Sequence, residues 1–129
     1  MKTTSIERIT VATEIWRQIR ASLTVSELMS WGLSKRVATE YNGMPALQMR
    51  VTGLQHKGWV YVALDYGRDV YEVFFVSVRG VVKNHLDEVY CDNLGDVLDR
   101  NIERGYGSES AYYKAAMADS NRKLNRKTY

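Results

Sequence analysis

The chain has 129 residues, of which 45% are hydrophobic and 26% charged, with a net charge of +3, the composition of one soluble globular domain. Its single cysteine, Cys91, excludes an internal disulfide, and no apolar run approaches the ~18 residues that a membrane span requires. Charged residues interrupt the first apolar positions, so no secretory leader is expected and the sequence predicts a cytoplasmic protein without a membrane partner.

Two helices are predicted at the N-terminal end. The first runs from Thr4 to about Ala21, and the second starts at Thr24; both begin with a capping box, Thr-Ser-Ile-Glu and Thr-Val-Ser-Glu. Gly32 suits the left-handed position that ends the second helix. In the first helix the apolar residues recur at spacings of three and four and are expected to share one buried face: Ile6, Ile9, Ala12, Trp16 and Ile19.

The middle of the chain alternates with a period of two, and turn residues arrive about every ten positions. Five antiparallel strands are predicted, at about 36–41, 46–54, 59–65, 70–78 and within 81–90. Asn42-Gly43 predicts a type I′ hairpin turn, because both of its positions require a positive φ. The fourth strand is apolar on both faces and is expected to be central and covered on both sides, and the fifth is expected to be interrupted at 83–85.

Two further helices are predicted after the strands. Asp92 is placed as the N-cap of a helix that runs to about Arg104 and ends at Gly105, and a last helix follows at about 110–123. The expected fold class is therefore α+β in a single domain, residues 1–129. It has two N-terminal helices, a five-stranded antiparallel meander, and one or two C-terminal helices packed on the sheet, with a basic, frayed end from about residue 120.

Few residues could support catalysis or bind a metal. His56 lies in a predicted turn and is expected to be solvated. His85, with the nearby acidic residues and Cys91, lacks the further ligands that a zinc site needs, so we predict no metal, cofactor or catalytic residue. Cys91 is expected to be a buried, inert thiol. The alternative, a small hydrolase or transferase with Cys91 as nucleophile and His85 as base, is the least favoured function.

An acidic run follows the predicted strands. Its members are spaced by four, three and four residues, so they share one face of the predicted helix: Asp92, Asp96, Asp99 and Glu103. A solvated face near the positive start of the helix explains this pattern most simply. The functional alternative is a docking surface for a basic protein partner.

Aromatic residues crowd the predicted sheet: Trp59, Tyr61, Tyr66, Tyr71, Phe74, Phe75 and Tyr90. We expect helices to cover these rings. If one sheet face were open, rings flanked by Arg50 and Lys57 could stack unpaired nucleic-acid bases. The basic C-terminal residues are expected to form a solvated tail, and in the alternative interpretation they contact phosphates: Arg122, Lys123, Arg126 and Lys127.

Short motifs in residues 33–104 resemble small uncharacterised proteins carried on mobile elements of gut Bacteroidetes. The motifs are Asn42-Gly43-Met44-Pro45-Ala46-Leu47, Val51-Thr52-Gly53, His56-Lys57-Gly58, Asp69-Val70-Tyr71 and Glu88-Val89-Tyr90-Cys91-Asp92-Asn93-Leu94. This resemblance implies a cytoplasmic setting and an accessory role on a mobile element. It implies no activity and no site residues.

The sequence therefore favours a non-catalytic protein-interaction or accessory module with an unidentified protein partner. The alternative is a single-stranded nucleic-acid-binding module that uses the sheet aromatics and the basic C-terminal end.

Overall fold

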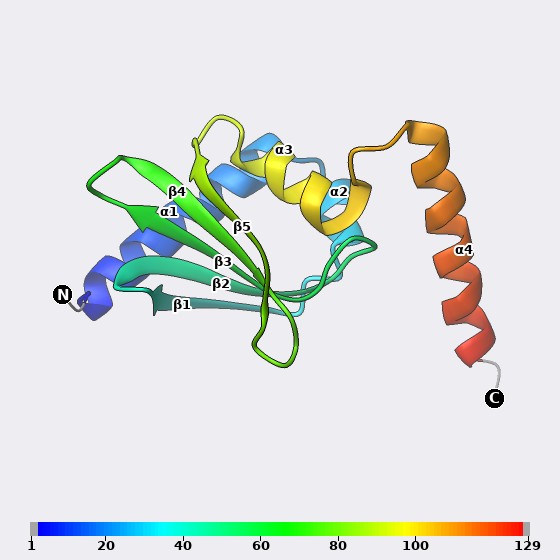
Figure 1. The fold of residues 1–129 in the computed structure, drawn as a ribbon, viewed down its shortest axis with the longest axis horizontal. Coiled ribbons are helices and arrows are strands. Elements are labelled where there is room, and N and C mark those ends of the chain that lie inside the picture. Colours follow the sequence, from blue (N-terminus) through cyan, green and yellow to red (C-terminus); the bar gives the residue numbers. More distant parts are fainter. Residues whose placement is uncertain (1–2, 128–129) are drawn as a thin grey trace.

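A five-stranded antiparallel meander, covered by helices on one face, forms the centre of the computed structural model, which describes residues 3–127 (Figure 1). The side chains of residues 109 and 120–127 lie outside the description. The elements are α1 (Ser5–Ser22), α2 (Val25–Ser30), β1 (Lys35–Tyr41), β2 (Met44–Thr52), β3 (Lys57–Asp65), β4 (Val70–Val76), β5 (Val82–Val89), α3 (Leu94–Asp99), the π-helical turn η1 (Arg100–Arg104) and α4 (Glu109–Lys127). The strand order β1-β2-β3-β4-β5 confirms the predicted α+β meander.

The helix starts and the first hairpin follow the local sequence signals. Thr4 and Thr24 both form the predicted capping boxes, each accepting a hydrogen bond from the backbone of the glutamate three residues on. Asn42 and Gly43 have φ values of 51° and 78°, and Gly32 has a φ of 60°. These turns are set by conformations that few other residues adopt without strain.

The buried face of α1 differs from the one predicted. Val11, Ala12, Ile15 and Ile19 are buried, whereas Ile6 and Ile9 are exposed, so the prediction for these two residues is wrong. The helix contacts β1 and β2 through the stripe at 11, 15 and 19, which leaves its first turns at the rim. Trp16 is only partly buried, with the Arg36 guanidinium 4.2 Å from its ring centroid.

Alternation along the strands separates two sheet faces. Apolar side chains of β2, β3 and β4 join α1, Trp31 and α3 in the main core, which includes Met49, Val62, Tyr71, Val73 and Phe75. A smaller cluster on the opposite face contains Ala46, Ala63, Phe74 and Val76. The strand β4 is buried on both faces as predicted, but it is the fourth of five strands and lies next to an edge.

The segment after β5 packs on the helix-covered face, with two corrections to the predicted boundaries. Asn93, not Asp92, precedes α3, and its side-chain oxygen accepts a hydrogen bond from the Tyr90 backbone N–H at 3.0 Å. The helix widens into η1 before Gly105, whose φ of 72° ends it as expected. The register shift opposite Phe75 and Val76 confirms the predicted interruption of β5 near Lys83.

The turn between β2 and β3 is fixed against η1. The carbonyl of Ile102 accepts hydrogen bonds from the backbone N–H groups of Gln55 and His56, at 2.9 and 3.2 Å. A Cβ atom on Gly53 would lie 2.1 Å from the same carbonyl oxygen, so only glycine allows this approach. The contact holds η1 beside the sheet and creates the rim of a polar pocket between η1 and β5.

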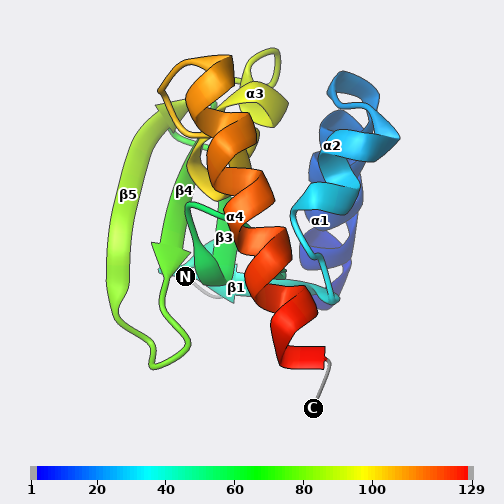
Figure 2. The same cartoon turned by 90° about the vertical axis from the view of Figure 1, so that its right-hand side faces the viewer.

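The last helix, α4, stands beyond the end of the sheet and none of its described side chains is buried (Figures 1 and 2). It is joined to the domain by Tyr112, whose hydroxyl donates a hydrogen bond to Glu103 at 2.8 Å. The prediction that C-terminal helices pack on the sheet therefore holds for α3 and η1 but not for α4. None of the helices in the described part of the chain has the length and apolar character needed to cross a membrane.

Candidate functional site

The sheet face opposite the main core carries a cluster of aromatic side chains, which we call the ring cluster: Tyr41, Trp59, Tyr61 and Phe74. The buried side chains of α1 and α3 all belong to the main core on the other face. Within residues 3–127, α1, α2 and α3 therefore lie together on one side of the sheet and leave the ring cluster without a helical cover (Figure 2). The expectation that helices enclose the sheet aromatics is correct for Tyr71 and Phe75. It is wrong for Trp59, Tyr61 and Phe74, which lie on the opposite face, and for Tyr66 and Tyr90, which are exposed.

Small residues explain how the ring cluster forms. Ala46 of β2 and Ala63 of β3 are directly opposite each other in the sheet. Because their side chains are short, the Tyr41 ring reaches across both strands, to centroid distances of 4.6 Å from Tyr61 and 4.3 Å from Phe74. Aromatic pairs at these distances favour tilted packing, which fixes the rings relative to one another.

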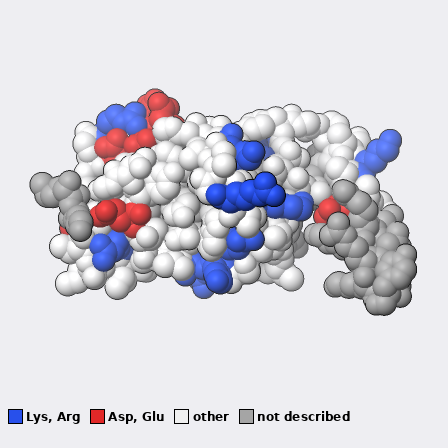
Figure 3. Space-filling view, turned by 60° about the horizontal axis from the view of Figure 1, so that its bottom comes forward, with Lys and Arg blue, Asp and Glu red and all other residues white. Residues whose placement is uncertain are grey.

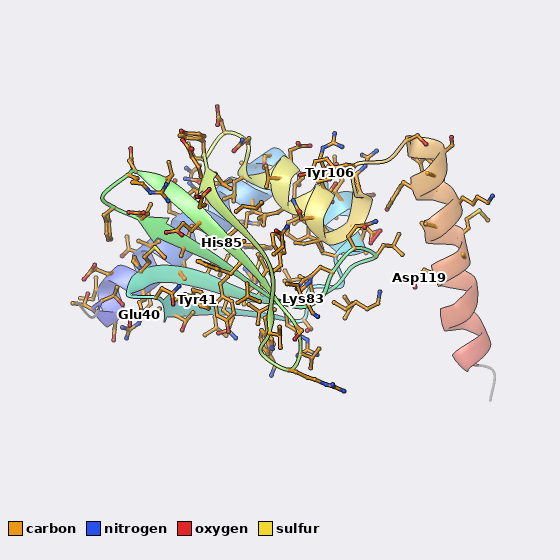
Figure 4. All side chains as sticks on the ribbon, viewed as in Figure 1. Glu40, Tyr41, Lys83, His85, Tyr106 and Asp119 are labelled. Atoms are coloured by element: carbon orange, nitrogen blue, oxygen red, sulfur yellow. The ribbon has the colours of Figure 1, made fainter. Side chains whose placement is uncertain are left out.

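The outer members of the ring cluster remain partly open to water. Tyr41, Trp59 and Tyr61 are half-buried, whereas Phe74 is buried between Tyr41 and the His85 ring, which stacks on it at 4.3 Å (Figure 4). Partial burial, with a smaller effect of Tyr41, raises the pKa of the Tyr61 hydroxyl. The face therefore offers neutral aromatic surface that is held in place by its neighbours.

Basic side chains gather at one end of this face. Arg50 stands over Trp59, with its guanidinium carbon 5.1 Å from the ring centroid, and Lys35 is its cross-strand neighbour on β1. Lys57 donates a hydrogen bond from its Nζ to the Gly53 carbonyl at 3.0 Å, so it is held at the start of β3. Because neighbouring strands are antiparallel, the starts of β1 and β3 and the end of β2 meet at the same end of the sheet.

Acidic side chains occupy the opposite end. Glu72 pairs with His85 at 2.9 Å, and Asp65 pairs with Arg68 at 3.0 Å. The hydrogen bond from Arg68 is the main reason that the pKa of Asp65 is lowered. On the side of the molecule shown in Figure 3, lysine and arginine side chains gather near the middle, and most of the acidic side chains lie toward the left, where basic side chains accompany them. The sheet thus has a basic end and an acidic end.

We compared this chain with protein-family models, curated proteins and solved structures. None of them matches it. The resemblance to mobile-element proteins therefore stays a prediction.

The acidic run does not form one exposed surface. Asp92 and Asp96 are exposed, but Asp99 and Glu103 are 3% and 6% exposed and face inward. Asp99 accepts a hydrogen bond from the Trp31 indole at 2.8 Å, and Glu103 accepts one from the Leu54 backbone N–H at 2.9 Å. The prediction of a solvated face is wrong for these two residues. The side of α3 and η1 that carries them packs against the end of α2 and the β2–β3 turn.

His56 and Cys91 lie in environments opposite to those predicted from the sequence. His56 is buried, with its Nε2 3.0 Å from the Trp59 carbonyl oxygen, whereas Cys91 is exposed in the turn before α3. Both predictions are wrong, because η1 covers the turn of His56 and nothing described covers that of Cys91. Among the described residues, no group of three or more histidine, cysteine or acidic side chains could hold a metal ion.

The four basic C-terminal residues belong to α4, but their side chains lie outside the described residues: Arg122, Lys123, Arg126 and Lys127. Sequence reasoning missed Tyr41 and Lys35 as members of the open face. The alternation Lys35, Val37, Thr39, Tyr41 and the Asn-Gly turn could have placed both on the face of Ala46.

Proposed function

We propose that this protein binds single-stranded nucleic acid on the open face of its sheet. The observation that carries the proposal is the half-buried ring cluster beside a basic sheet end, with no described helix above it. This is the second of the three functions that the sequence suggested, and it gains weight because the expected acidic docking surface loses two of its four members to the interior.

The rings supply surfaces on which unpaired bases stack. Stacking of one base on an aromatic side chain contributes about 1–3 kcal/mol and depends little on base identity, since every base has a π-face. Trp59 and Tyr61 are two residues apart on β3, so they lie next to each other on the same face, and Tyr41 extends the surface toward β1. A platform of this kind suits a single strand better than a duplex, whose bases are already stacked on one another.

The charge distribution supports the same ligand. Arg50, Lys35 and Lys57 offer cations for phosphates at one end of the platform. Glu72 and Asp65 would repel phosphates at the other end. We therefore expect the phosphate backbone to follow the basic end while the bases extend over the rings.

A protein-interaction role remains the second candidate from the sequence. It would use exposed apolar surface of the open face, or the two exposed carboxylates Asp92 and Asp96. It predicts no affinity for oligonucleotides, so one experiment distinguishes the two functions.

The proposal is tested by fluorescence anisotropy with labelled single-stranded DNA, single-stranded RNA and duplex DNA of equal length, at low salt. We expect both single strands to bind more tightly than the duplex. Trp59→Ala and Tyr61→Leu should each weaken single-strand binding by roughly 5- to 150-fold, the equivalent of one lost stacking contact.

Two control variants separate stacking from folding. Tyr61→Phe keeps the ring and should retain affinity, whereas Tyr66→Ala removes an exposed ring in the β3–β4 turn, away from the ring cluster, and should have no effect. Circular dichroism and thermal unfolding check that each variant folds. Absence of binding to every oligonucleotide, or equal affinity of the folded Tyr61→Leu variant and the wild type, contradicts the proposal.

A further inference from the structure

A pocket of about 290 Å³ lies at the β5 edge of the sheet, on the side where η1 packs, which is opposite to the ring cluster. It is formed by the β2–β3 turn, β4, β5 and η1 with the residues that follow. Among the described residues, its lining carries no carboxylate but has two cations, three amide side chains and an exposed tyrosine: Lys83, Arg100, Gln55, Asn84, Asn101 and Tyr106. This volume is near the lower limit of small-molecule sites, so it suits one ring with its polar substituents.

The inner wall of the pocket is held by hydrogen bonds and a ring contact. His56 is buried there. Its Nε2 is hydrogen-bonded to the Trp59 carbonyl oxygen, and its ring packs edge-on against Phe75 with 5.5 Å between the ring centroids. The backbone of Gln55 is hydrogen-bonded to η1, and Gly105 packs closely against the Gln55 side chain. The pocket is therefore built by main-chain contacts that do not depend on a ligand.

The two basic side chains of the pocket come from different elements, β5 and η1. Lys83 lies at the register shift of β5, where an extra residue turns side chains out of the regular alternation. Arg100 is at the start of η1 and pairs with Asp96, which lies outside the lining. A bound anion would thus meet two positive groups and no opposing carboxylate within the lining.

Tyr106 presents an aromatic surface to the same space. Its hydroxyl accepts a hydrogen bond from the Asn101 amide at 3.2 Å, yet the residue is 72% exposed. The Arg100 guanidinium carbon lies 5.8 Å from its ring centroid. An oriented but uncovered ring beside amides and cations matches the parts of a nucleotide, which are a base that stacks, polar edges that form hydrogen bonds, and a phosphate.

We propose that this pocket binds a phosphate-bearing nucleotide at the end of the single strand whose other bases stack on the ring cluster. The inference rests on the proposed function for the strand and adds a specificity for phosphorylated ends. On β5, His85 lies against Phe74 of the ring cluster and Lys83 lies in the pocket lining, only two residues apart (Figure 4). Phe75 and Asn84 place the pocket on the helix-covered side of the sheet, so a strand that leaves the ring cluster over His85 passes over the β5 edge at Lys83 to reach it.

The experiment measures binding of one oligonucleotide in three forms: with a 5′-phosphate, with a 3′-phosphate, and with hydroxyls at both ends. We expect one phosphorylated form to bind about tenfold more tightly than the hydroxyl form, as one charge-assisted contact would give. Lys83→Gln should reduce this preference to about onefold while the hydroxyl form keeps its affinity. Tyr106→Ala removes the stacking ring and should weaken all three forms. Lys35→Gln is the matched control and should weaken all three forms by the same factor.

The outcomes separate this inference from the proposed function. Equal affinity for the three forms, a preference that survives Lys83→Gln, or an unchanged affinity of Tyr106→Ala overturns the pocket assignment while strand binding stands. Adenosine or thymidine monophosphate, added as competitors, test the free nucleotide as the source of the same chemistry. If the free monophosphate competes at the same concentration as the unlabelled phosphorylated oligonucleotide, the pocket is a site for free nucleotides and the strand-end assignment is overturned. If no oligonucleotide binds, both proposals fail.

Discussion

At the scale of single residues, the contact between Trp31 and Asp99 places a carboxyl group in the interior. Trp31 is fully buried, Asp99 is 3% exposed, and the indole Nε1–H donates to the carboxylate at 2.8 Å. Burial raises the pKa of Asp99, and the hydrogen bond from Trp31 opposes this only in part. The charged form of Asp99 is therefore less favourable in the folded protein than in the unfolded chain.

This shift has a defined effect on stability. The folded protein holds the Asp99 proton to higher pH than the unfolded chain does, so the free energy of unfolding falls as pH rises from the ordinary carboxyl pKa through the raised one. Above the raised pKa the loss is complete. Asp99→Asn keeps an oxygen that accepts from Trp31 and carries no charge, so it should lack this part of the pH dependence.

Urea unfolding of the wild type and Asp99→Asn, over about pH 4 to pH 8, measures the difference. Asp92→Asn serves as the control, because it removes an exposed carboxylate in the turn before α3 and keeps Asp99. Parallel pH profiles for Asp99→Asn and the wild type would contradict the assignment.

At the scale of elements, Tyr112 connects the start of α4 to η1. Its hydroxyl donates to Glu103, while the Arg104 guanidinium carbon lies 5.5 Å from its ring centroid. Burial and the hydrogen bond to Glu103 raise the pKa of Tyr112 to about 12. The neutral hydroxyl is the form that donates, so the folded protein favours it.

The attachment of α4 should therefore be sensitive to high pH. Its stabilising contribution is fully present below the ordinary tyrosine pKa of about 10 and is lost as pH rises toward about 12. Ultraviolet titration of tyrosinate should show one fewer late-ionising group in Tyr112→Phe than in the wild type, because the pKa values of Tyr61, Tyr71 and Tyr90 are also raised. An equal number of late-ionising groups in the two proteins would contradict this.

The same substitution should loosen α4 near neutral pH. Loss of a hydrogen bond to a charged group costs about 1.5–3 kcal/mol, so limited trypsin digestion after Arg104 or Lys114 should become roughly tenfold faster or more. Tyr113→Phe is the matched control, because the neighbouring ring is exposed and has no part in the Glu103 contact.

At the scale of the whole molecule, the two ends of the sheet carry opposite charge. Neutralising the basic end, as Lys35→Gln, Arg50→Gln and Lys57→Gln together, should reduce the salt dependence of single-strand binding. Each lost phosphate contact changes the slope of log K against log salt by about 0.7, so the triple variant should lose about 2 from the slope. Anisotropy titrations at several salt concentrations measure it.

Two further variants locate the phosphate contacts. Arg68→Gln removes a cation at the acidic end, where Arg68 is paired with Asp65, and should leave the slope unchanged. The four C-terminal residues Arg122, Lys123, Arg126 and Lys127, changed together to Gln, test whether α4 contributes. A slope that is the same in the wild type and the basic-end triple variant would show that the sheet does not contact phosphates.

The elements that short-range interactions specify were predictable. The capping boxes at Thr4 and Thr24, the Asn42-Gly43 turn and the alternation of β2 each depend on residues within a few positions of one another. The number of strands and the α+β class followed from these signals.

The environments that long-range packing sets were not predictable. His56 has a turn sequence but is buried, because η1, about 45 residues later, packs over that turn. Asp99 and Glu103 have the spacing of a solvated helical stripe, but the π-helical turn and the contacts with Trp31 and Leu54 draw them inward.

For this protein, the sequence by itself determined where helices, strands and turns occur, because caps, turn conformations and side-chain alternation act over a few residues. Only the tertiary structure decided which sheet face the helices cover. Both faces of β4 are apolar, so the pattern alone does not distinguish them. The choice depends on where α1 and α3 pack, and it leaves Tyr41, Trp59 and Tyr61 together on the uncovered side.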